Sequence, residues 1–311
     1  MDIQSRALGM MLGIGIGDAL GAPVEFLESG AFSPVDDYRA GGKFNLPAGY
    51  YTDDTAMTLC LADSLIKKRG CDLKHQLENY IKWLNEGFMS SSGQAVGCGK
   101  NTYSALLKYM KTKQPVYRNK NRKNAGNGSL MRIAPVAIFY RDNLKKAMQI
   151  AGKTSYTTHA LKICADACMV YSGILVGILS GMSKKDVLSE EFGEFLVEKV
   201  LNSYKFDEKI VDVIKGSYKS KDREEIESSG YVVHSLEASL WAFYHTESFK
   251  EAVLCAVNLG KDSDTIGAIC AMAAGGYYGV ESIDEKYKEK LKNYELICNI
   301  TQKLLERRGN E

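Results

Sequence analysis

Helical periodicity is the feature that most constrains how this chain can fold. Apolar residues recur at steps of three and four along most of the sequence, which is the spacing of one face of an α-helix. Within 159–180 the residues with this spacing are Leu161, Ala165, Cys168, Met169, Ser172 and Leu175. Convincing alternation of apolar and polar residues, which would indicate β-strands, is absent. We therefore predict an all-α fold, in which the helices pack as one compact orthogonal domain.

The periodic segments divide the chain into helices and loops. We predict helices over residues 2–16, 55–68, 72–86, 101–111, 142–153, 159–180, 184–203, 207–217, 233–245, 248–258, 265–278 and 293–307. Glycine-rich stretches at 29–50 and 90–99 are predicted to be loops. No Ser/Pro-rich linker interrupts the sequence, so residues 1–311 are predicted to form a single domain.

Charge and cysteine usage narrow the class of protein. The formal net charge is +2, so nucleic acid is not expected as a primary partner. The eight cysteines show neither the spacing of a disulfide framework nor a C-x-x-C pair, which predicts reduced thiols and a cytoplasmic location. The N-terminus does not resemble a signal peptide, and no apolar run reaches about 18 residues, so no membrane span is predicted. The sequence leaves the oligomeric state open.

One segment, 111–123, is strongly basic. It contains no acid, and its basic residues are Lys111, Lys113, Arg118, Lys120, Arg122 and Lys123. A solvated loop is the simpler interpretation. A rim that contacts phosphate is the alternative, because the segment leads directly into a glycine-rich turn.

Two short segments place paired aspartates beside hydroxyl groups. The first is Thr-Asp-Asp-Thr at 52–55, the second is Asp-Ser-Asp-Thr at 262–265, and an apolar helical segment follows each. Aspartate and threonine favour helix N-termini, so capping explains one or two of these groups. Two carboxylates and two hydroxyls within four residues, occurring twice, exceed what capping needs.

Divalent cations account for this concentration of acids. Four buried aspartates would repel one another, and hard oxygen ligands of this kind suit Mg²⁺ or Mn²⁺. The clusters lack the Cys and His ligands that zinc prefers. Two other classes of helical protein that use aspartate clusters are excluded because the sequence lacks their motifs. Met57 stands where the D-D-x-x-D motif of a terpene synthase needs aspartate, and no histidine is followed by the aspartate that a His-Asp phosphohydrolase requires.

Three further elements carry candidate site residues. Glu25 follows a glycine-rich segment, predicted to be a turn, and could act as a general acid or base. Gly126, Asn127, Gly128 and Ser129 form a turn that allows close backbone approach to a ligand, and N–H groups at the start of a helix favour phosphate. His159 precedes a helix, where a capping role would be unremarkable, and a lone histidine is more often structural than functional.

In their order along the chain, these motifs resemble those of the ADP-ribosylglycohydrolase family, which includes the dinitrogenase-reductase-activating glycohydrolases. The matching segments are Gly-Asp-Ala-Leu-Gly at 17–21 with Glu25, Thr-Asp-Asp-Thr at 52–55, Gly-Asn-Gly-Ser-Leu-Met-Arg at 126–132, Thr158-His159, and Asp-Ser-Asp-Thr-Ile-Gly at 262–267. The resemblance spans about residues 5–280, and the motifs are specific jointly, through their order and wide separation.

The resemblance implies an all-α hydrolase with a dinuclear metal site at helix N-termini, where two Mg²⁺ or Mn²⁺ ions hold the ribose of an ADP-ribosylated protein, polymer or small molecule. It implies the metal ligands Thr52, Asp53, Asp54, Asp262, Asp264 and Thr265, with Asp264 bridging. The implied catalytic residues are Glu25, Asp53 and Asp54. The implied substrate contacts are Gly97, Gly126, Asn127, Gly128, Ser129 and His159.

One position departs from part of the family. Arginine-type bacterial members often carry D-x-G before an N-T-T segment, and here the corresponding residues are Gly97, Cys98 and Gly99. Gly97 is more like members that act on O-linked or polymeric ADP-ribose, so we favour those acceptors and keep arginine as the alternative. A catalytically silent ADP-ribose binder and a metal-dependent phosphohydrolase on an unrelated helical fold are the other hypotheses. A silent member would be expected to lack one of the aspartates or Glu25.

Overall fold

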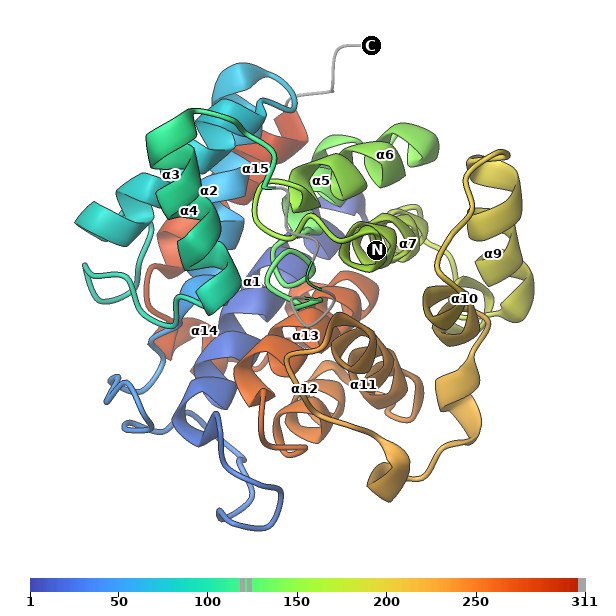
Figure 1. Cartoon of the computed structure of the whole chain (residues 1–311). Coiled ribbons are helices and arrows are strands. Elements are labelled where there is room, and N and C mark those ends of the chain that lie inside the picture. The colour runs from blue at the N-terminus through green and yellow to red at the C-terminus, as the bar shows by residue number, and fades with distance from the viewer. Residues whose placement is uncertain (118–120, 122–124, 307–311) are drawn as a thin grey trace.

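The computed structural model describes residues 1–117, 121 and 125–306 of the chain. These residues form fifteen α-helices, and within the same ranges no β-strand occurs, only isolated bridges, which confirms the predicted all-α fold (Figure 1). The helices are α1 (Ile3–Gly21), α2 (Asp53–Lys68), α3 (Leu73–Glu86), α4 (Lys100–Thr112), α5 (Ala134–Phe139), α6 (Leu144–Ser155), α7 (Lys162–Leu179), α8 (Lys184–Val187), α9 (Glu190–Glu194), α10 (Glu208–Ile214), α11 (Val232–Tyr244), α12 (Phe249–Val257), α13 (Ser263–Tyr278), α14 (Glu285–Lys290) and α15 (Tyr294–Glu306).

Helices α1 and α13 lie in direct backbone contact at the centre of the molecule (Figure 1). Glycines spaced four residues apart line the face of α1 that touches α13, namely Gly9, Gly13, Gly17 and Gly21. A Cβ atom at Gly17 would lie 2.3 Å from the carbonyl oxygen of Gly267, a separation that real Cβ atoms do not reach. Only glycine therefore permits this packing. The contact brings Asp18 of α1 close to Asp264 of α13.

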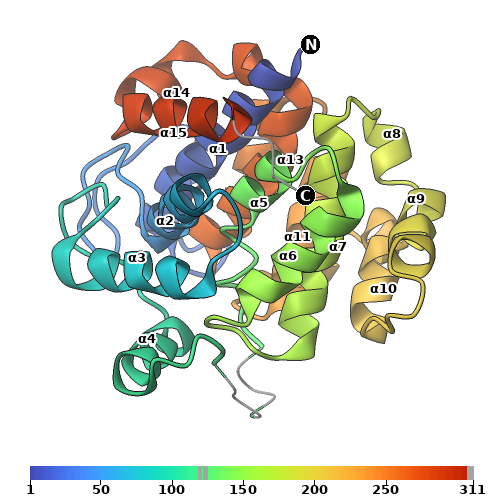
Figure 2. The same ribbon diagram turned by 90° about the horizontal axis from the view of Figure 1, so that it is seen from above.

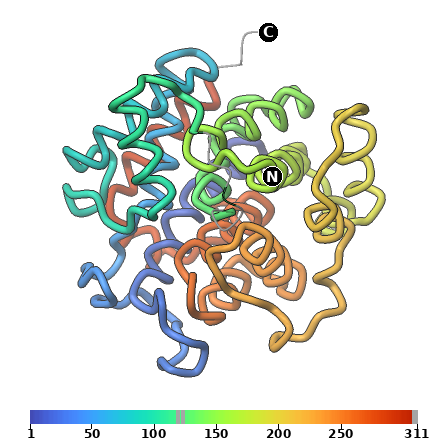
Figure 3. Tube along the Cα trace, viewed as in Figure 1, coloured from blue at the N-terminus to red at the C-terminus, as the bar shows by residue number. Residues whose placement is uncertain are grey.

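The other helices surround this central pair. Helices α2, α5 and α15 pack against α1, while α7, α11 and α12 pack against α13. In the two views, α3 and α4 lie on one side of the molecule and α9 and α10 on the other (Figures 1 and 2). The Cα trace shows N-terminal and C-terminal parts of the chain running side by side through the centre (Figure 3). The two aspartate clusters therefore meet although they are about 200 residues apart.

Two helical segments are apolar and long enough to cross a membrane by length and composition. They are Ile3–Val24 and Lys162–Leu179, and 89% of the most apolar window of each is buried inside the protein. Such burial is typical of core helices. All eight cysteines are free thiols, as predicted. Four of the six basic residues of segment 111–123 lie outside the described residues, namely Arg118, Lys120, Arg122 and Lys123.

The predicted helix positions are largely confirmed, with three differences. The glycine-rich segment after residue 16 is helical to Gly21 and not a turn, because its glycines fit against α13. The predicted helix 184–203 is divided into α8, α9 and a π-helix at Phe195–Val200, with Ser189 starting α9 by accepting a hydrogen bond from the Phe192 amide. The short helices α5 and α14 were not predicted as helices.

Candidate metal centre and active site

The first turn of α2 is held by a buried carboxylate from α1. Asp18 is fully buried and accepts four hydrogen bonds. Its Oδ1 accepts from the amide and the hydroxyl of Thr52, at 2.9 and 2.8 Å, and its Oδ2 accepts from the amide and the hydroxyl of Thr55, at 3.0 and 2.6 Å. These bonds occupy both carboxylate oxygens and satisfy amides at the helix start that have no partner within the helix. They fix the direction in which the following aspartates point.

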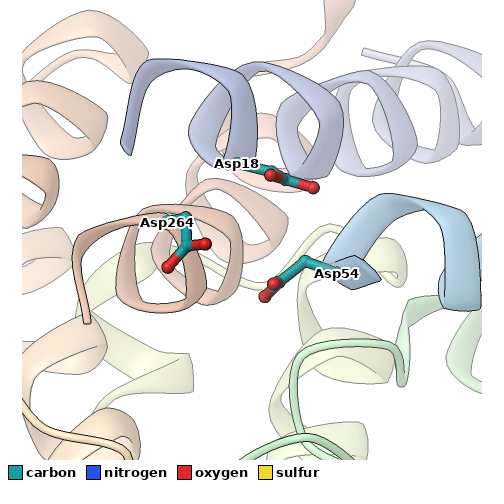
Figure 4. A group of neighbouring side chains, drawn as sticks. All are labelled: Asp18, Asp54 and Asp264. Atoms are coloured by element: carbon teal, nitrogen blue, oxygen red, sulfur yellow. The ribbon is translucent and has the colours of Figure 1, made fainter. Parts of the chain in front are cut away.

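Carboxylates from three helices meet beside this turn. Figure 4 shows Asp18 from α1, Asp54 from α2 and Asp264 from α13 around a common space, and one oxygen of each lies within 4.8 Å of the others. Glu25, Asp262 and Asp264 form a second group by the same measure. The hydroxyl of Thr265 lies 3.4 Å from Oδ2 of Asp54 and links the two clusters. The two sequence motifs therefore form one acidic centre, at the N-termini of α2 and α13.

The acidic centre is strongly destabilised electrostatically without a counter-charge. Burial raises the pKa of Asp53, Asp54 and Asp264 well above the usual value, and neighbouring carboxylates raise each pKa further. Burial, with repulsion from Asp264, Asp262 and Asp53, raises the pKa of Glu25 to about 10. Oδ1 of Asp54 and Oε2 of Glu25 are buried without a hydrogen-bond partner. Oxygen donors that are buried, crowded and unpaired fit a divalent cation.

These shifts predict an unusual dependence of stability on pH. The folded, metal-free protein binds protons at carboxyls that are ionised in the unfolded chain at neutral pH. Its free energy of unfolding should therefore fall as pH rises from the ordinary carboxyl value of 4.5 toward the raised values. We expect a loss of about 3 kcal/mol or more between pH 5 and 8 in chelator. Urea unfolding with EDTA or with Mn²⁺ measures it, and Mn²⁺ should restore stability at pH 8. Metal-free stability that does not change with pH would contradict this account.

The acidic centre opens into a cleft of about 650 Å³. Its floor holds Asp53, Asp54, Asp264 and Thr265, and its walls come from six segments between helices and from the start of α4. The wall residues are Glu25, Phe26, Lys43, Phe44, Gly97, Cys98, Gly99, Lys100, Asn101, Thr102, Ala125, Gly126, Asn127, Gly128, Met131, His159, Gly230, Tyr231 and Asp262. Larger and smaller cavities occur elsewhere on the described surface, but this cleft is the one that contains the acidic centre.

One wall is built by the 126–129 turn packed against His159. A Cβ atom at Gly128 would lie 2.8 Å from Cε1 of His159, so the turn and the imidazole fit together only because that residue is glycine. Nδ1 of His159 lies 2.8 Å from the Thr158 hydroxyl, which also accepts from buried Arg132. Burial, with the nearby Arg132 charge, lowers the pKa of His159 to about 3. The imidazole is therefore neutral at pH 7, and it lines the cleft.

Gly97 closes the cleft beside Asp53. Its φ is +87°, and a Cβ atom there would lie 2.2 Å from Oδ1 of Asp53 and 3.3 Å from Cβ of Thr52. A side chain at residue 97 would thus be strained and would displace a candidate metal ligand. The backbone of this loop is suited to glycine at residue 97.

The structure brings together almost all of the site residues predicted from sequence. Asn127 joins them to the second cluster, because its Nδ2 donates to Oδ2 of Asp262 at 2.5 Å. The side chain of Ser129 is directed elsewhere: it is buried, and its Oγ accepts from the Ser155 hydroxyl. Sequence reasoning did not assign a role to Asp18 or Arg132. The sequence signal that could have identified them is a charged residue within an otherwise apolar segment, because a buried charge needs partners.

Comparison with known proteins identifies the family of this chain. A model of the ADP-ribosylglycohydrolase family matches residues 1–311. The chain belongs to the ADP-ribosylglycohydrolase family. It is 34% identical over 299 residues to the ADP-ribosylarginine hydrolase Tri1 of Serratia proteamaculans, which covers 96% of this chain and 78% of the relative. It is 28% identical over 296 residues to the ADP-ribosyl-dinitrogen reductase glycohydrolase of Rhodospirillum rubrum, covering 93% and 91%.

A solved structure supports the same assignment. The structure, described as an ADP-ribosylglycohydrolase-related protein complex, superimposes with a TM-score of 0.85 at 34% identity and covers 98% of this chain and 99% of that one. Relatives in this metal-dependent family are named as glycohydrolases, so this chain is an ADP-ribosyl glycohydrolase. The acidic centre provides residues that could hold the metal.

The position of Asp18 leads to a prediction for an Asp18→Asn variant of this glycohydrolase. An amide in place of the carboxylate would put an NH₂ group against donors that now point at an oxygen. We expect the free energy of unfolding to fall by about 2–3 kcal/mol and Mn²⁺ affinity to fall about 10- to 100-fold, as for other residues that orient metal ligands. Urea titration and calorimetry measure the two effects. Thr55→Val removes one of the four bonds and should give a smaller loss of both. Unchanged Mn²⁺ affinity in both variants would show that Asp18 does not orient the ligands.

Proposed function

We propose that this chain is a hydrolase that depends on Mg²⁺ or Mn²⁺ and releases ADP-ribose from a modified side chain or polymer. The observation that supports the proposal most strongly is the convergence of two aspartate clusters in one buried centre at the base of an open cleft. All the carboxylates of the predicted metal set are present there with Glu25, which disfavours a catalytically silent binder. An ordinary structural role would not leave oxygens of Glu25 and Asp54 buried and unpaired.

The chain's own residues suggest how the reaction proceeds. Two divalent cations, held by Thr52, Asp53, Asp54, Asp262, Asp264 and Thr265, would supply positive charge that binds and orients ribose oxygens. Glu25 stands at the edge of this set, on the loop after α1, with one oxygen free of hydrogen bonds. In this proposal it moves a proton between water or the leaving group and solvent as oxocarbenium-like charge develops on the ribose. The neutral His159 and the 126–128 backbone would contact the diphosphate and ribose.

For the acceptor, the geometry at residue 97 favours an O-linked or polymeric ADP-ribose. The cleft lacks an aspartate at this position that could bind a guanidinium, and the backbone there does not accommodate one without displacing Asp53. Arginine-linked ADP-ribose is the second candidate, because a relative that is 34% identical is named an ADP-ribosylarginine hydrolase. That name describes the relative, whereas Gly97 and its close approach to Asp53 belong to this chain.

A release assay tests the function and the acceptor together. Serine-linked and arginine-linked ADP-ribosyl peptides are incubated with the protein in Mg²⁺, in Mn²⁺ or in EDTA, and free ADP-ribose is quantified. We expect release that EDTA abolishes, with the serine-linked peptide cleaved faster. Faster cleavage of the arginine-linked peptide would overturn the acceptor assignment and keep the hydrolase. No release from either peptide or from polymeric ADP-ribose, while free ADP-ribose binds, would favour a silent binder.

A further inference from the structure

A cation and two aromatic rings form a rim at the Glu25 end of the cleft. Phe26 follows Glu25 directly, and the residue is unusually exposed for a phenylalanine, at 56%. Nζ of Lys43 lies 4.1 Å from the centroid of the Phe26 ring and 6.0 Å from that of Phe44. All three residues line the cleft. We call Phe26, Lys43 and Phe44 the cationic rim.

The backbone holds the cationic rim in place. Phe26 has a φ of +68°, a conformation that costs energy for a residue with a side chain. It is kept there by hydrogen bonds of 2.6 Å from the Phe26 amide to the Lys261 carbonyl and from the Lys261 amide to the Leu27 carbonyl. Lys43 and Phe44 belong to a tight turn closed by reciprocal bonds between Gly41 and Leu46, at 2.9 and 3.1 Å. An exposed ring held in a strained conformation is typical of a functional contact.

A series of contacts connects the proposed ADP-binding wall to the cationic rim. At one end, His159 contacts Gly128. The neighbouring Asn127 donates a hydrogen bond to Asp262. Lys261, which directly precedes Asp262, is hydrogen-bonded through its backbone to Phe26 and Leu27 at the other end. An ADP-ribose whose diphosphate contacts the His159 wall and whose ribose lies over the acidic centre would direct its acceptor toward the rim. This step rests on the proposed function.

The charge of the rim favours one kind of acceptor. Apart from Glu25 and the aspartates of the acidic centre, whose charge bound divalent cations would offset, the Lys and Asp/Glu side chains that line the cleft among the described residues are Lys43 and Lys100. No ion pair involving Lys43 occurs within the ranges 1–117, 121 and 125–306. A lysine over an aromatic ring presents a localised positive charge beside an apolar surface. It attracts carboxylates and repels a guanidinium.

We propose that the cationic rim binds the acceptor segment of the substrate and selects segments with acidic residues next to the ADP-ribosylated side chain. Lys43 is the specificity-determining residue, and the ring of Phe26 supports its ammonium group and packs against the acceptor backbone. The occupant is therefore an acidic peptide segment of the modified protein.

The test compares peptides that differ only in flanking charge. Each carries ADP-ribose through the linkage that the wild-type chain cleaves, flanked by two glutamates or by two lysines. We expect the wild type to prefer the acidic peptide by about threefold to fivefold in kcat/KM, the range of one exposed charge pair. Lys43→Glu should abolish or reverse this preference, and Phe26→Leu should weaken it. In 0.5 M NaCl the wild-type preference should shrink, because salt screens exposed charges.

A matched control separates contact from overall charge. Lys303→Glu changes the net charge equally, at an exposed position on α15 outside the cleft lining, and should keep the wild-type preference. The affinity for free ADP-ribose, measured by calorimetry, should stay within about twofold in Lys43→Glu. Equal preferences in Lys43→Glu and Lys303→Glu would overturn the role of the rim while leaving the hydrolase intact. No release by the wild type from any peptide would remove the proposed function and, with it, the acceptor on which the rim proposal rests.

Discussion

Replacing Asp264 by alanine is expected to abolish both divalent-cation binding and release of ADP-ribose. Asp264 belongs to both groups of carboxylates that could hold a metal, so its loss weakens each of them. We expect kcat to fall by at least about 10³-fold, the upper range for removing one group that stabilises developing charge, and Mn²⁺ to stop raising the melting temperature. Calorimetry with Mn²⁺, thermal melting in EDTA and in Mn²⁺, and the release assay measure the three effects. Full activity in this variant would exclude the dinuclear centre.

A control is needed because any buried substitution can damage the fold. Asp166 on α7 is also fully buried, but its carboxylate is bonded to the Tyr204 hydroxyl and to the Asp207 amide, away from the cleft. Asp166→Ala should lower stability and keep the increase in melting temperature that Mn²⁺ produces. Asp264→Asn should show the opposite pattern at pH 8 in EDTA. It removes a repelling charge from the centre, so metal-free stability should rise while the Mn²⁺ effect disappears.

The parts of the site that could be predicted from sequence are those where several acidic residues stand together at the predicted start of a helix. Asp53 and Asp54 begin α2, and Asp264 lies in the first turn of α13, so each cluster was visible as a helix start with too many acids for capping. That the two aspartate clusters share one site could be inferred only indirectly: burying several like charges is costly, and a shared divalent cation would offset that cost. The structure confirms that the two clusters are neighbours, because the Thr265 hydroxyl lies beside a carboxylate oxygen of Asp54.

Other parts depend on packing, which a single sequence does not display. The segment after residue 16 resembles a glycine-rich turn, yet it is helical because its glycines face another helix about 250 residues away. The carboxylate of Asp18 acts through Thr52 and Thr55, and nothing in the local sequence connects these residues. The cationic rim depends on the positive φ of Phe26 and on the turn closed by Gly41 and Leu46. The conformation of Phe26 depends on hydrogen bonds with Lys261, which lies far away in the sequence.

Replacing Glu25 by glutamine should remove most of the turnover and keep most of the metal binding. Glutamine preserves the size and the neutral hydrogen-bonding capacity of the side chain, but its amide does not accept or release a proton at neutral pH. We expect kcat to fall by about 10²- to 10⁴-fold, the usual contribution of a general acid or base, with Mn²⁺ affinity within about tenfold of the wild type. Single-turnover release and calorimetry measure the two quantities.

The matched control for this variant is Glu28→Gln, three residues further along the same loop. Glu28 is exposed and pairs with Lys261 at 3.3 Å, so its loss changes the loop charge equally without touching the acidic centre. We expect near wild-type turnover there. In the metal-free protein at pH 8, Glu25→Gln should also be more stable than the wild type, because the raised pKa of Glu25 makes its ionisation costly to the fold. Near-normal turnover in Glu25→Gln with intact Mn²⁺ binding would show that another group moves the proton. In that case Glu25 would have only a structural part in the centre, and a water in the cleft would be the first candidate for moving the proton.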